Sequence, residues 1–469
     1  MPKLPALALC AALLETALAA TPASAELSPR QRADIAVLIE RAMADDRAYD
    51  ILASLTTEVG PRLGGTEAEA RARGWGEAKL KSLGFQNVRT ETFDMPAWSR
   101  IAESAAIVSP YPQPLHITAL GNSVSTPEGG LEGDIVRFAS LTALQQAPMT
   151  GLEGKIVFVD EGMTRTQDGS GYGVAVAKRS GAANEAGKRG AAAAIIRSVG
   201  TDSHRFPHTG NMTYAEGVTR IPTAALSNPD ADLLARALRS TKKPVRMTLD
   251  IKTARTETAQ SGNVVGEIAG RTDELVVVGG HLDSWDLGTG AIDDGAGIAI
   301  TVAAAKLVDE MKGKPGRTIR VVMWGAEEVG IHGGKAYAER HKGDLARHFL
   351  AAESDFGAGR IWQVSTRFGQ GREALAKDFA EALRPLGIGP GDNEAGGGAD
   401  VGPLRLAGVP VIDLSQDGSD YFDLHHTAND TLDKVDPQAL KQNVAAWAVM
   451  LYLAAEAEGG FRAVDAAAP

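Results

Sequence analysis

The chain has 469 residues, of which 44% are hydrophobic and 23% are charged. This balance supplies enough apolar surface for a packed core and argues against disorder, and the length fits about two domains. The formal net charge of -11 argues against a nucleic-acid partner, because binding to a phosphate backbone needs clustered Lys and Arg. A small or peptidic substrate is expected instead.

The first 25 residues have the layout of a secretory signal peptide. Lys3 precedes an apolar stretch from Leu4 to Leu14, and Ala23-Ser24-Ala25 offers small residues for cleavage, with a cut after Ala19 as the alternative. The apolar stretch is shorter than the roughly 20 residues of a membrane span, and no later segment is long and uncharged enough. We therefore expect a secreted or periplasmic protein without a membrane span. Its mature part lacks the only cysteine, Cys10, and so has neither disulfides nor thiolate ligands.

Helical periodicity dominates the start of the mature chain. Ser28-Pro29 is a typical helix start, and apolar residues recur at helical spacing up to about Leu55. The segment from Gly60 to Thr66 interrupts this pattern as a loop, and a second helix is expected from Glu67 to Leu83. Short strands follow through Ile107.

Residues 115–255 differ from the preceding segment in their pattern of predicted strands and helices, and they are interpreted as a separate, β-rich domain. Lys155 to Val159 is a strand candidate, and an alanine-rich helix is expected around Ala182 to Ala193. A capped helix from Ser227 to Leu238 precedes an alternating strand from Val245 to Ile251. No catalytic constellation lies inside this segment.

Strands and helices alternate from Gly262 onward. Two apolar strands, Leu275 to Val278 and Thr318 to Met323, flank a helix from Gly297 to Met311 and so form a βαβ unit. The remaining candidates are two strands and a final helix, namely His348 to Ala352, Val409 to Leu414, and Leu440 to Leu451. The predicted fold is α/β, a mostly parallel sheet flanked by helices on both faces.

Several polar residues come directly after these strands. His281 follows the first strand, Glu327-Glu328 the second, and Asp355 the strand that begins at His348. In open α/β sheets, ligands gather at the carboxyl ends of the strands, so these side chains are expected to converge. Asp293 and His426 lie in longer loops that could reach the same place.

The loop around His281 and Asp293 combines an imidazole with carboxylates. A neutral histidine can bind zinc while its other ring nitrogen donates to a carboxylate, and Asp283 is placed for that supporting task. Asp293 could then bridge two metal ions. The alternative is that Asp293-Asp294-Gly295 is simply a turn and His281 ends a strand.

Glu327-Glu328 is a stronger signal, because adjacent side chains diverge and can serve different functions. Glu328 could bind a metal ion while Glu327 acts as general base, taking a proton from water and delivering it to the leaving amine. The alternative is a charged helix N-terminus that the helix dipole favours.

His425-His426 could complete the ligand set or decorate the surface. Asp430 lies four residues beyond His426 and is expected to orient it, as Asp283 would orient His281. No role is predicted for His425.

These residues suit a site for two zinc ions. Three carboxylates and two neutral histidines oppose four positive charges, and a bridging hydroxide would complete the balance. Two ions about 3.5 to 4 Å apart can hold the attacking oxygen and the substrate carbonyl together. Nitrogen and oxygen ligands without sulfur suit zinc, and cobalt or manganese would also fit.

Taken together, the motifs resemble metallopeptidase family 28, the co-catalytic zinc exopeptidases. The resemblance rests on five segments in family order: His281-x-Asp283-Ser284, Asp293-Asp294-Gly295, Glu327-Glu328, Glu353-Ser354-Asp355 and His426-Thr427-x-x-Asp430-Thr431. It implies His281 and Asp355 on one zinc, Glu328 and His426 on the other, Asp293 between them, and Glu327 as base.

The resemblance also covers most of the remaining chain. Gly60-Pro61-Arg62-Leu63 resembles an early loop of the family, and residues 115–255 resemble a protease-associated (PA) insert, which leaves 26–114 and 256–469 as the catalytic domain. Where many relatives have Ser-Asp-His, this chain has Ala399-Asp400-Val401, which puts the substrate pocket in doubt. A homodimer is implied by resemblance alone.

Three functions remain open on the same fold. The first is an exported exopeptidase for dipeptides or short peptides, with aminopeptidase and carboxypeptidase action not separated. The second is a catalytically silent receptor or peptide-binding protein, although such relatives typically lack the ligands that this chain keeps. An aminoacyl cyclase is the third, and it would not be expected to retain the complete two-metal set.

Overall fold

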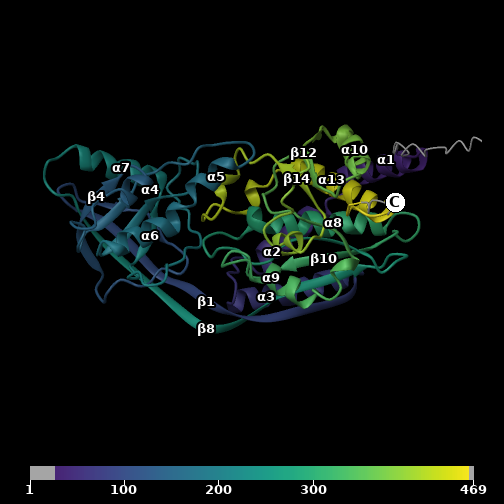
Figure 1. Cartoon of the computed structure of the whole chain (residues 1–469). Coiled ribbons are helices and arrows are strands. Elements are labelled where there is room, and N and C mark those ends of the chain that lie inside the picture. Colours follow the sequence, from purple (N-terminus) through teal and green to yellow (C-terminus); the bar gives the residue numbers. More distant parts are fainter. Residues whose placement is uncertain (1–26, 464–469) are drawn as a thin grey trace, which may run out of the picture.

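Two long antiparallel strands organise the chain. β1 (Gln86–Ser109) and β8 (Arg246–Ile268) pair along most of their length and connect two lobes, as Figure 1 shows. The smaller lobe is called the insert and comprises residues 110–245, and the other described residues form the main lobe. The computed structural model describes residues 27–463, so the predicted signal peptide, residues 1–25, and Cys10 lie outside the described residues.

The first helices follow the predicted starts but not all of the predicted ends. α1 (Pro29–Ala44) begins at a capping box on Ser28, and α3 (Glu67–Ser82) is capped by Thr66. The single helix predicted up to Leu55 is wrong, because α2 (Arg47–Glu58) is separate. Asp45 is extended, with ψ 129°, and its carboxylate accepts a hydrogen bond from the Arg47 amide at 2.7 Å. This side-chain acceptor replaces the helical ladder at the break.

The main sheet is mixed. Its order is β13-β12-β14-β11-β9-β10-β8, in which the central strands β14, β11, β9 and β10 are parallel, whereas β8 and β12 run antiparallel to their neighbours β10 and β14. The strand bounds are β9 (Leu275–His281), β10 (Thr318–Trp324), β11 (His348–Glu353), β12 (Ile361–Arg367), β13 (Gly389–Pro390) and β14 (Val411–Gln416). The predicted parallel arrangement therefore holds for the four central strands, whereas the sheet as a whole is mixed.

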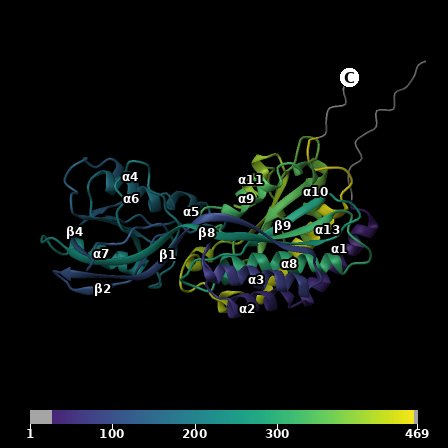
Figure 2. The ribbon, with the colours of Figure 1, turned by 90° about the horizontal axis from the view of Figure 1, so that it is seen from below.

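Helices cover both faces of this sheet (Figure 2). Val276 and Val278 of β9 face the larger core, where α8 (Ala296–Asp309) and α13 (Pro437–Glu456) pack, while Leu275 and Val277 face a second core. That second core includes residues of α9 (His332–Arg340) and α11 (Gly402–Leu406). Helix α10 (Glu373–Leu383) contacts β12 and α13.

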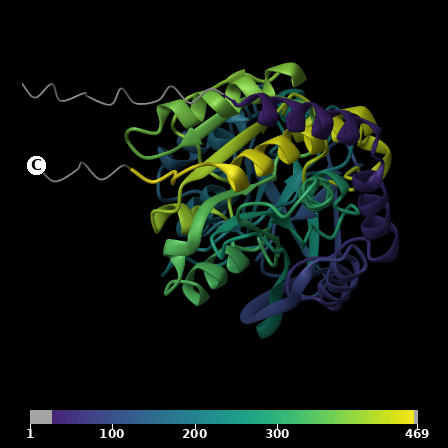
Figure 3. The ribbon, with the colours of Figure 1, turned by 90° about the vertical axis from the view of Figure 1, so that its right-hand side faces the viewer.

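The first and last helices of the described chain lie side by side. α1 packs along α13, as the end-on view in Figure 3 shows. Between Leu27 and Ala463, no helix is long and apolar enough to cross a membrane.

The insert has a sheet and hydrophobic cores of its own. Strands β4, β5, β6 and β7 are parallel, β3 is antiparallel to β7, and β4 joins β8. The elements are β2 (Gln113–Leu115), β3 (Ile117–Ala119), β4 (Leu131–Phe138), α4 (Leu141–Gln145), β5 (Ile156–Val159), α5 (Ser170–Ala175), α6 (Lys178–Lys188), β6 (Ala193–Arg197), β7 (Thr223–Leu226) and α7 (Asn228–Arg239). Helices on a parallel sheet make this lobe α/β.

Candidate metal centre

The five predicted ligands come together at the carboxyl ends of the central strands. His281 is the last residue of β9, Glu328 follows β10, and Asp355 follows β11. Asp293 lies in the irregular turn before α8, and His426 follows the short helix α12 (Tyr421–Leu424). Because β9, β10 and β11 are adjacent and parallel, their ends meet at one edge of the sheet.

Asp293 lies at the middle of this cluster. Its Oδ1 atom lies 3.0 Å from Nε2 of His281, and its Oδ2 atom lies 3.2 Å from Nε2 of His426. Asp355 Oδ1 is 3.4 Å from the same His281 nitrogen, and Glu328 Oε2 is 2.9 Å from the same His426 nitrogen. The arrangement therefore has two halves, each with one imidazole and one carboxylate, that share the carboxylate of Asp293.

Neighbouring carboxylates hold the turn that carries Asp293. Asp294 Oδ2 accepts from the His281 amide and its Oδ1 from the Gly297 amide, each at 3.0 Å. Asp430 Oδ1 accepts from the Ile292 amide at 2.6 Å, and its Oδ2 accepts from the Asp293 amide at 3.2 Å. The sequence predicts that Asp430 orients His426, but its carboxylate instead positions the backbone of Asp293.

Asp283 connects two ligand-bearing segments. Nδ1 of His281 donates to the main-chain carbonyl of Asp283 at 2.9 Å, whereas the carboxylate lies farther away, at 3.7 Å. That carboxylate accepts from the amides of Glu327 at 2.9 Å and Glu328 at 3.3 Å. Asp283 thus orients His281 through its backbone and the Glu327-Glu328 pair through its side chain.

Glu327 is half-buried beside the ligands. Burial raises the pKa of its carboxyl well above the usual range, and the charges of Asp355 and Glu328 act in the same direction. A carboxyl with a raised pKa is suited to taking up and releasing a proton near neutral pH.

The cluster fits cations. Asp293 Oδ2 and Glu328 Oε1 are buried oxygens without a hydrogen-bond partner among residues 27–463. Burial also raises the pKa of Glu328, and the charge of Asp293 adds to the shift. Buried carboxylates that lack donors are costly unless a positive ion compensates them. Imidazole and carboxylate donors without sulfur match the preference of zinc.

The insert supplies the partner of His426, which sequence reasoning did not identify. Nδ1 of His426 donates to the carbonyl of Thr209 at 3.2 Å, and the Thr209 amide donates to the carbonyl of His426 at 3.0 Å. His425, for which no role is predicted, stacks on His426 with ring centroids 3.5 Å apart. No sequence motif marks Thr209, because the contact is made by its main chain.

Arg62, from the Gly60-Pro61-Arg62-Leu63 loop, also supports the site. Its fully buried guanidinium donates to the carbonyls of Leu282 at 2.5 Å, Thr289 at 2.6 Å and Gly290 at 2.9 Å. It thereby secures the segment between His281 and Asp293.

Asp400, the one residue of Ala399-Asp400-Val401 that keeps the family pattern, is buried near the cluster. Its amide donates to Glu353 Oε2 at 2.7 Å, and its Oδ1 accepts from the Gly334 amide at 2.7 Å. Burial raises its pKa to about 8. Asp400 thus ties the end of β11 to α9.

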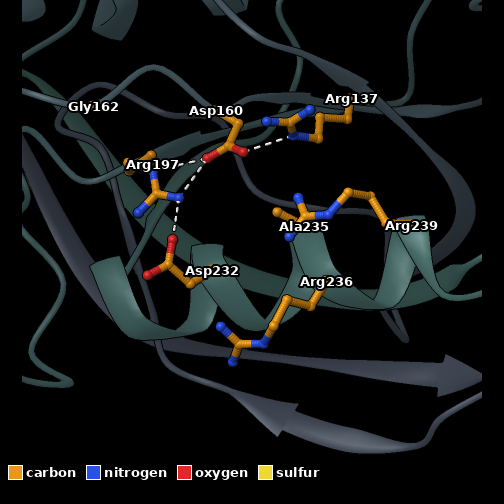
Figure 4. A pocket seen from close by; sticks show the side chains of 8 residues that line it. All are labelled: Arg137, Asp160, Gly162, Arg197, Asp232, Ala235, Arg236 and Arg239. Atoms are coloured by element: carbon orange, nitrogen blue, oxygen red, sulfur yellow. Dashed lines mark hydrogen bonds and ion pairs between the residues drawn. The ribbon is translucent and has the colours of Figure 1, made fainter.

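A separate cavity of about 400 Å³ lies in the insert, and Figure 4 shows its lining. Asp160 pairs with Arg137 at 2.6 Å and Arg197 at 2.7 Å, and Arg197 also pairs with Asp232 at 2.7 Å. These charges are paired with one another, and the lining includes none of the predicted ligands.

Comparison with known proteins adds independent information. The profile of "Peptidase family M28" matches residues 263–451. Carboxypeptidase Q of Bos taurus is 36% identical over 418 residues, which cover 88% of this chain and 86% of that protein. The crystal structure of a Peptidase M28 precursor from Shewanella amazonensis SB2B is 48% identical with a TM-score of 0.91, covering 93% of this chain and 99% of the other. BSAP, a zinc aminopeptidase from Bacillus subtilis, shares the fold at 20% identity, with a TM-score of 0.65 and coverage of 88% and 96%.

Proposed function

Because the chain belongs to peptidase family M28 and is a zinc metallopeptidase, we propose that it is an exopeptidase that holds two zinc ions and hydrolyses dipeptides or short peptides. One observation carries this proposal. The two oxygens of Asp293 face different histidines, with His281 Nε2 at 3.0 Å from Oδ1 and His426 Nε2 at 3.2 Å from Oδ2. A carboxylate with one oxygen in each half of a ligand cluster can bridge two ions.

The ligands divide between the two halves of the cluster. His281 and Asp355 would hold one ion, in accord with the 3.4 Å between His281 Nε2 and Asp355 Oδ1. Glu328 and His426 would hold the other, in accord with the 2.9 Å between Glu328 Oε2 and His426 Nε2. Bound zinc lowers the pKa of water and polarises the substrate carbonyl. Cobalt or manganese suits the same donors.

Glu327 would act as the general base. Its carboxylate would take the proton of the attacking water and pass it to the departing amine nitrogen, a role that the half-buried position and the raised pKa of this carboxyl support. Asp283 holds Glu327 in place through the amide bond of 2.9 Å. Glu328, the next residue, faces His426 instead, so the pair divides proton transfer and ligation between adjacent positions.

Three further expectations belong to the same proposal. The pattern of residues 1–25 supports export through a cleavable signal peptide. The separate cores of the insert support a PA-like domain near 115–255 within a catalytic domain of 26–114 and 256–469. A homodimer is the remaining expectation, and sedimentation of the purified protein would test it.

The test is peptide cleavage by zinc-loaded mature protein, followed by mass spectrometry. The panel contains free dipeptides and tripeptides together with their N-acetylated and C-amidated forms, so that the end that must be free is read directly. Relatives with the names carboxypeptidase Q and aminopeptidase YwaD leave both directions open.

The matched variant is Glu327→Gln, which keeps the size of the side chain but cannot accept the proton. Loss of a general base typically costs about 10²- to 10⁴-fold in rate, and the zinc content is expected to stay unchanged. If the zinc-loaded wild type cleaved no peptide, the chain would be a peptide-binding protein on this fold.

A further inference from the structure

The insert packs against the segment of the main lobe that carries His426 and forms hydrogen bonds with its main chain. The main-chain carbonyls of the loop Phe422–His426 accept hydrogen bonds from residues 201–209. The pairs are Thr201 N to Phe422 O at 3.0 Å, His204 Nε2 to Asp423 O at 2.6 Å, His208 Nδ1 to His425 O at 2.6 Å, and Thr209 N to His426 O at 3.0 Å. In this loop, therefore, four carbonyls have donors that come from the other lobe.

His426 needs such support. Its φ of 62° lies in the left-handed region, which a residue with a side chain adopts at a cost of roughly 1–3 kcal/mol unless its surroundings determine it. Within the loop itself, the Leu424 carbonyl accepts from the Thr427 amide at 3.1 Å. The His425 amide donates to the Tyr421 carbonyl at 3.0 Å, and the donors to the carbonyls of His425 and His426 come from the insert.

His208 is the most constrained of these donors. Its ring is fully buried, and Nδ1 must carry the proton because the carbonyl of His425 can only accept. Nε2 lies 2.5 Å from Asp202 Oδ2, a contact that requires a proton between the two groups and that sets the orientation of the ring. The ring also packs against Gly200, where a Cβ atom would lie 2.2 Å from Nε2. His208 thus has one orientation available, with its donor directed at the metal loop.

We propose that Asp202 and His208 are positioning residues that the insert contributes to the metal centre. By holding the carbonyl of His425, they direct Nε2 of His426 toward Asp293 and Glu328, so the insert is an integral part of the site. This inference rests on the proposed zinc function. The insert contains none of the predicted ligands, but in this proposal it fixes the direction of one of them, His426.

The experiment measures zinc retention by the full-length mature protein. Wild type and variants are dialysed against chelators of increasing strength, and zinc per chain is determined by mass spectrometry of the metal. His208→Leu removes the donor and keeps an apolar side chain in the buried space. His208→Asn keeps an N–H close to the position of Nδ1. Asp202→Ala leaves the ring but removes the group that orients it.

His208→Leu is expected to weaken the binding of one of the two zinc ions by at least about tenfold, the lower end of the effect of residues that support ligands. His208→Asn is expected to restore most of the affinity, and Asp202→Ala to lie between the two. Cleavage should fall in parallel and recover at saturating zinc, because the loss is in ligand placement.

Arg189→Met is the control. Arg189 is a buried residue of the insert that donates to main-chain carbonyls, those of Gln145 at 3.0 Å and Ala147 at 3.1 Å, but none of these belongs to the loop that carries His426. The inference is overturned if His208→Leu retains zinc like the wild type, or if Arg189→Met loses zinc to the same extent. A wild type that takes up no zinc would overturn the proposed function itself, which is a distinct result.

Discussion

Replacing Arg62 by methionine is expected to destabilise the main lobe strongly, because the guanidinium is fully buried and bonds to main-chain carbonyls, three of them between His281 and Asp293 and a more distant one at Gly60, 3.3 Å away. Methionine retains much of the buried apolar contact but offers no donor. The carbonyl of Gly290 keeps a second partner, the Gly295 amide at 3.0 Å. The carbonyls of Leu282 and Thr289 lose their only donor among the described residues.

The magnitude follows from these two carbonyls. A buried acceptor that loses its donor costs about 1–3 kcal/mol, so two of them cost about 2–6 kcal/mol, and we expect a fall of about 4 kcal/mol in the free energy of unfolding. Burial of the guanidinium lowers its pKa, and the charges of Asp430 and Asp283 oppose that shift. Removing the cation therefore also leaves these carboxylates less compensated, which adds to the loss.

The assay is equilibrium unfolding in urea, followed by tryptophan fluorescence in the presence of a chelator, so that zinc binding does not contribute. Arg30→Met is the matched control, because the Arg30 side chain is 84% exposed and its ion pair with Asp34 is long, at 3.6 Å. We expect a change within about 0.5 kcal/mol for that variant. A change below about 1 kcal/mol for Arg62→Met would refute the assignment of Arg62 as a structural support.

Two further predictions concern pH and metal. Burial raises the pKa of Asp378 to about 6 from 3.8, and the charge of Glu381 adds to the shift. The folded state thus binds this proton more tightly, and stability is lost as the pH rises from the lower to the higher value. Asp378→Asn is therefore expected to have a higher Tm than the wild type at about pH 7.5 and an equal Tm at about pH 3, whereas a constant difference would contradict the shift. Removal of zinc is expected to lower the Tm, because an ion present at a thousandfold its Kd contributes about 4 kcal/mol. Calorimetry should show this loss in Glu327→Gln as in the wild type and a smaller loss in Glu328→Gln, and equal losses in both variants would contradict the ligand assignment.

The positions of the predicted ligands could be reasoned from sequence because strand ends are local features. Apolar runs identify β9, β10 and β11, and the polar residues that follow them must meet if the strands are parallel and adjacent. His281, Glu328 and Asp355 lie together for this reason. The antiparallel direction of β8 and β12 does not follow from the sequence pattern, since periodicity reports burial but not strand direction.

The distinction between neighbouring carboxylates could not be reached in the same way. Asp293 and Asp294 are equivalent in sequence, yet Asp293 faces both histidines whereas Asp294 accepts amides of His281 and Gly297. Which of two adjacent carboxylates turns toward the site depends on the local backbone, and here that backbone is held by Asp430. Spacing along the chain shows that Asp430 is near the site but not which group it serves.

The contacts of His426 illustrate how a lobe without predicted ligands can support the proposed metal centre. A ligand needs a fixed direction as well as a donor atom, and main-chain groups supply direction without any characteristic side chain. Thr209 holds both the ring and the carbonyl of His426 through its backbone alone. Main-chain contacts of this kind have no sequence motif. A division of the chain by composition therefore treats residues 115–255 as a domain that takes no part in the site. Under the proposed zinc function, the hydrogen bonds of residues 201–209 to the loop that carries His426 make the docking of the two lobes part of the ligand geometry.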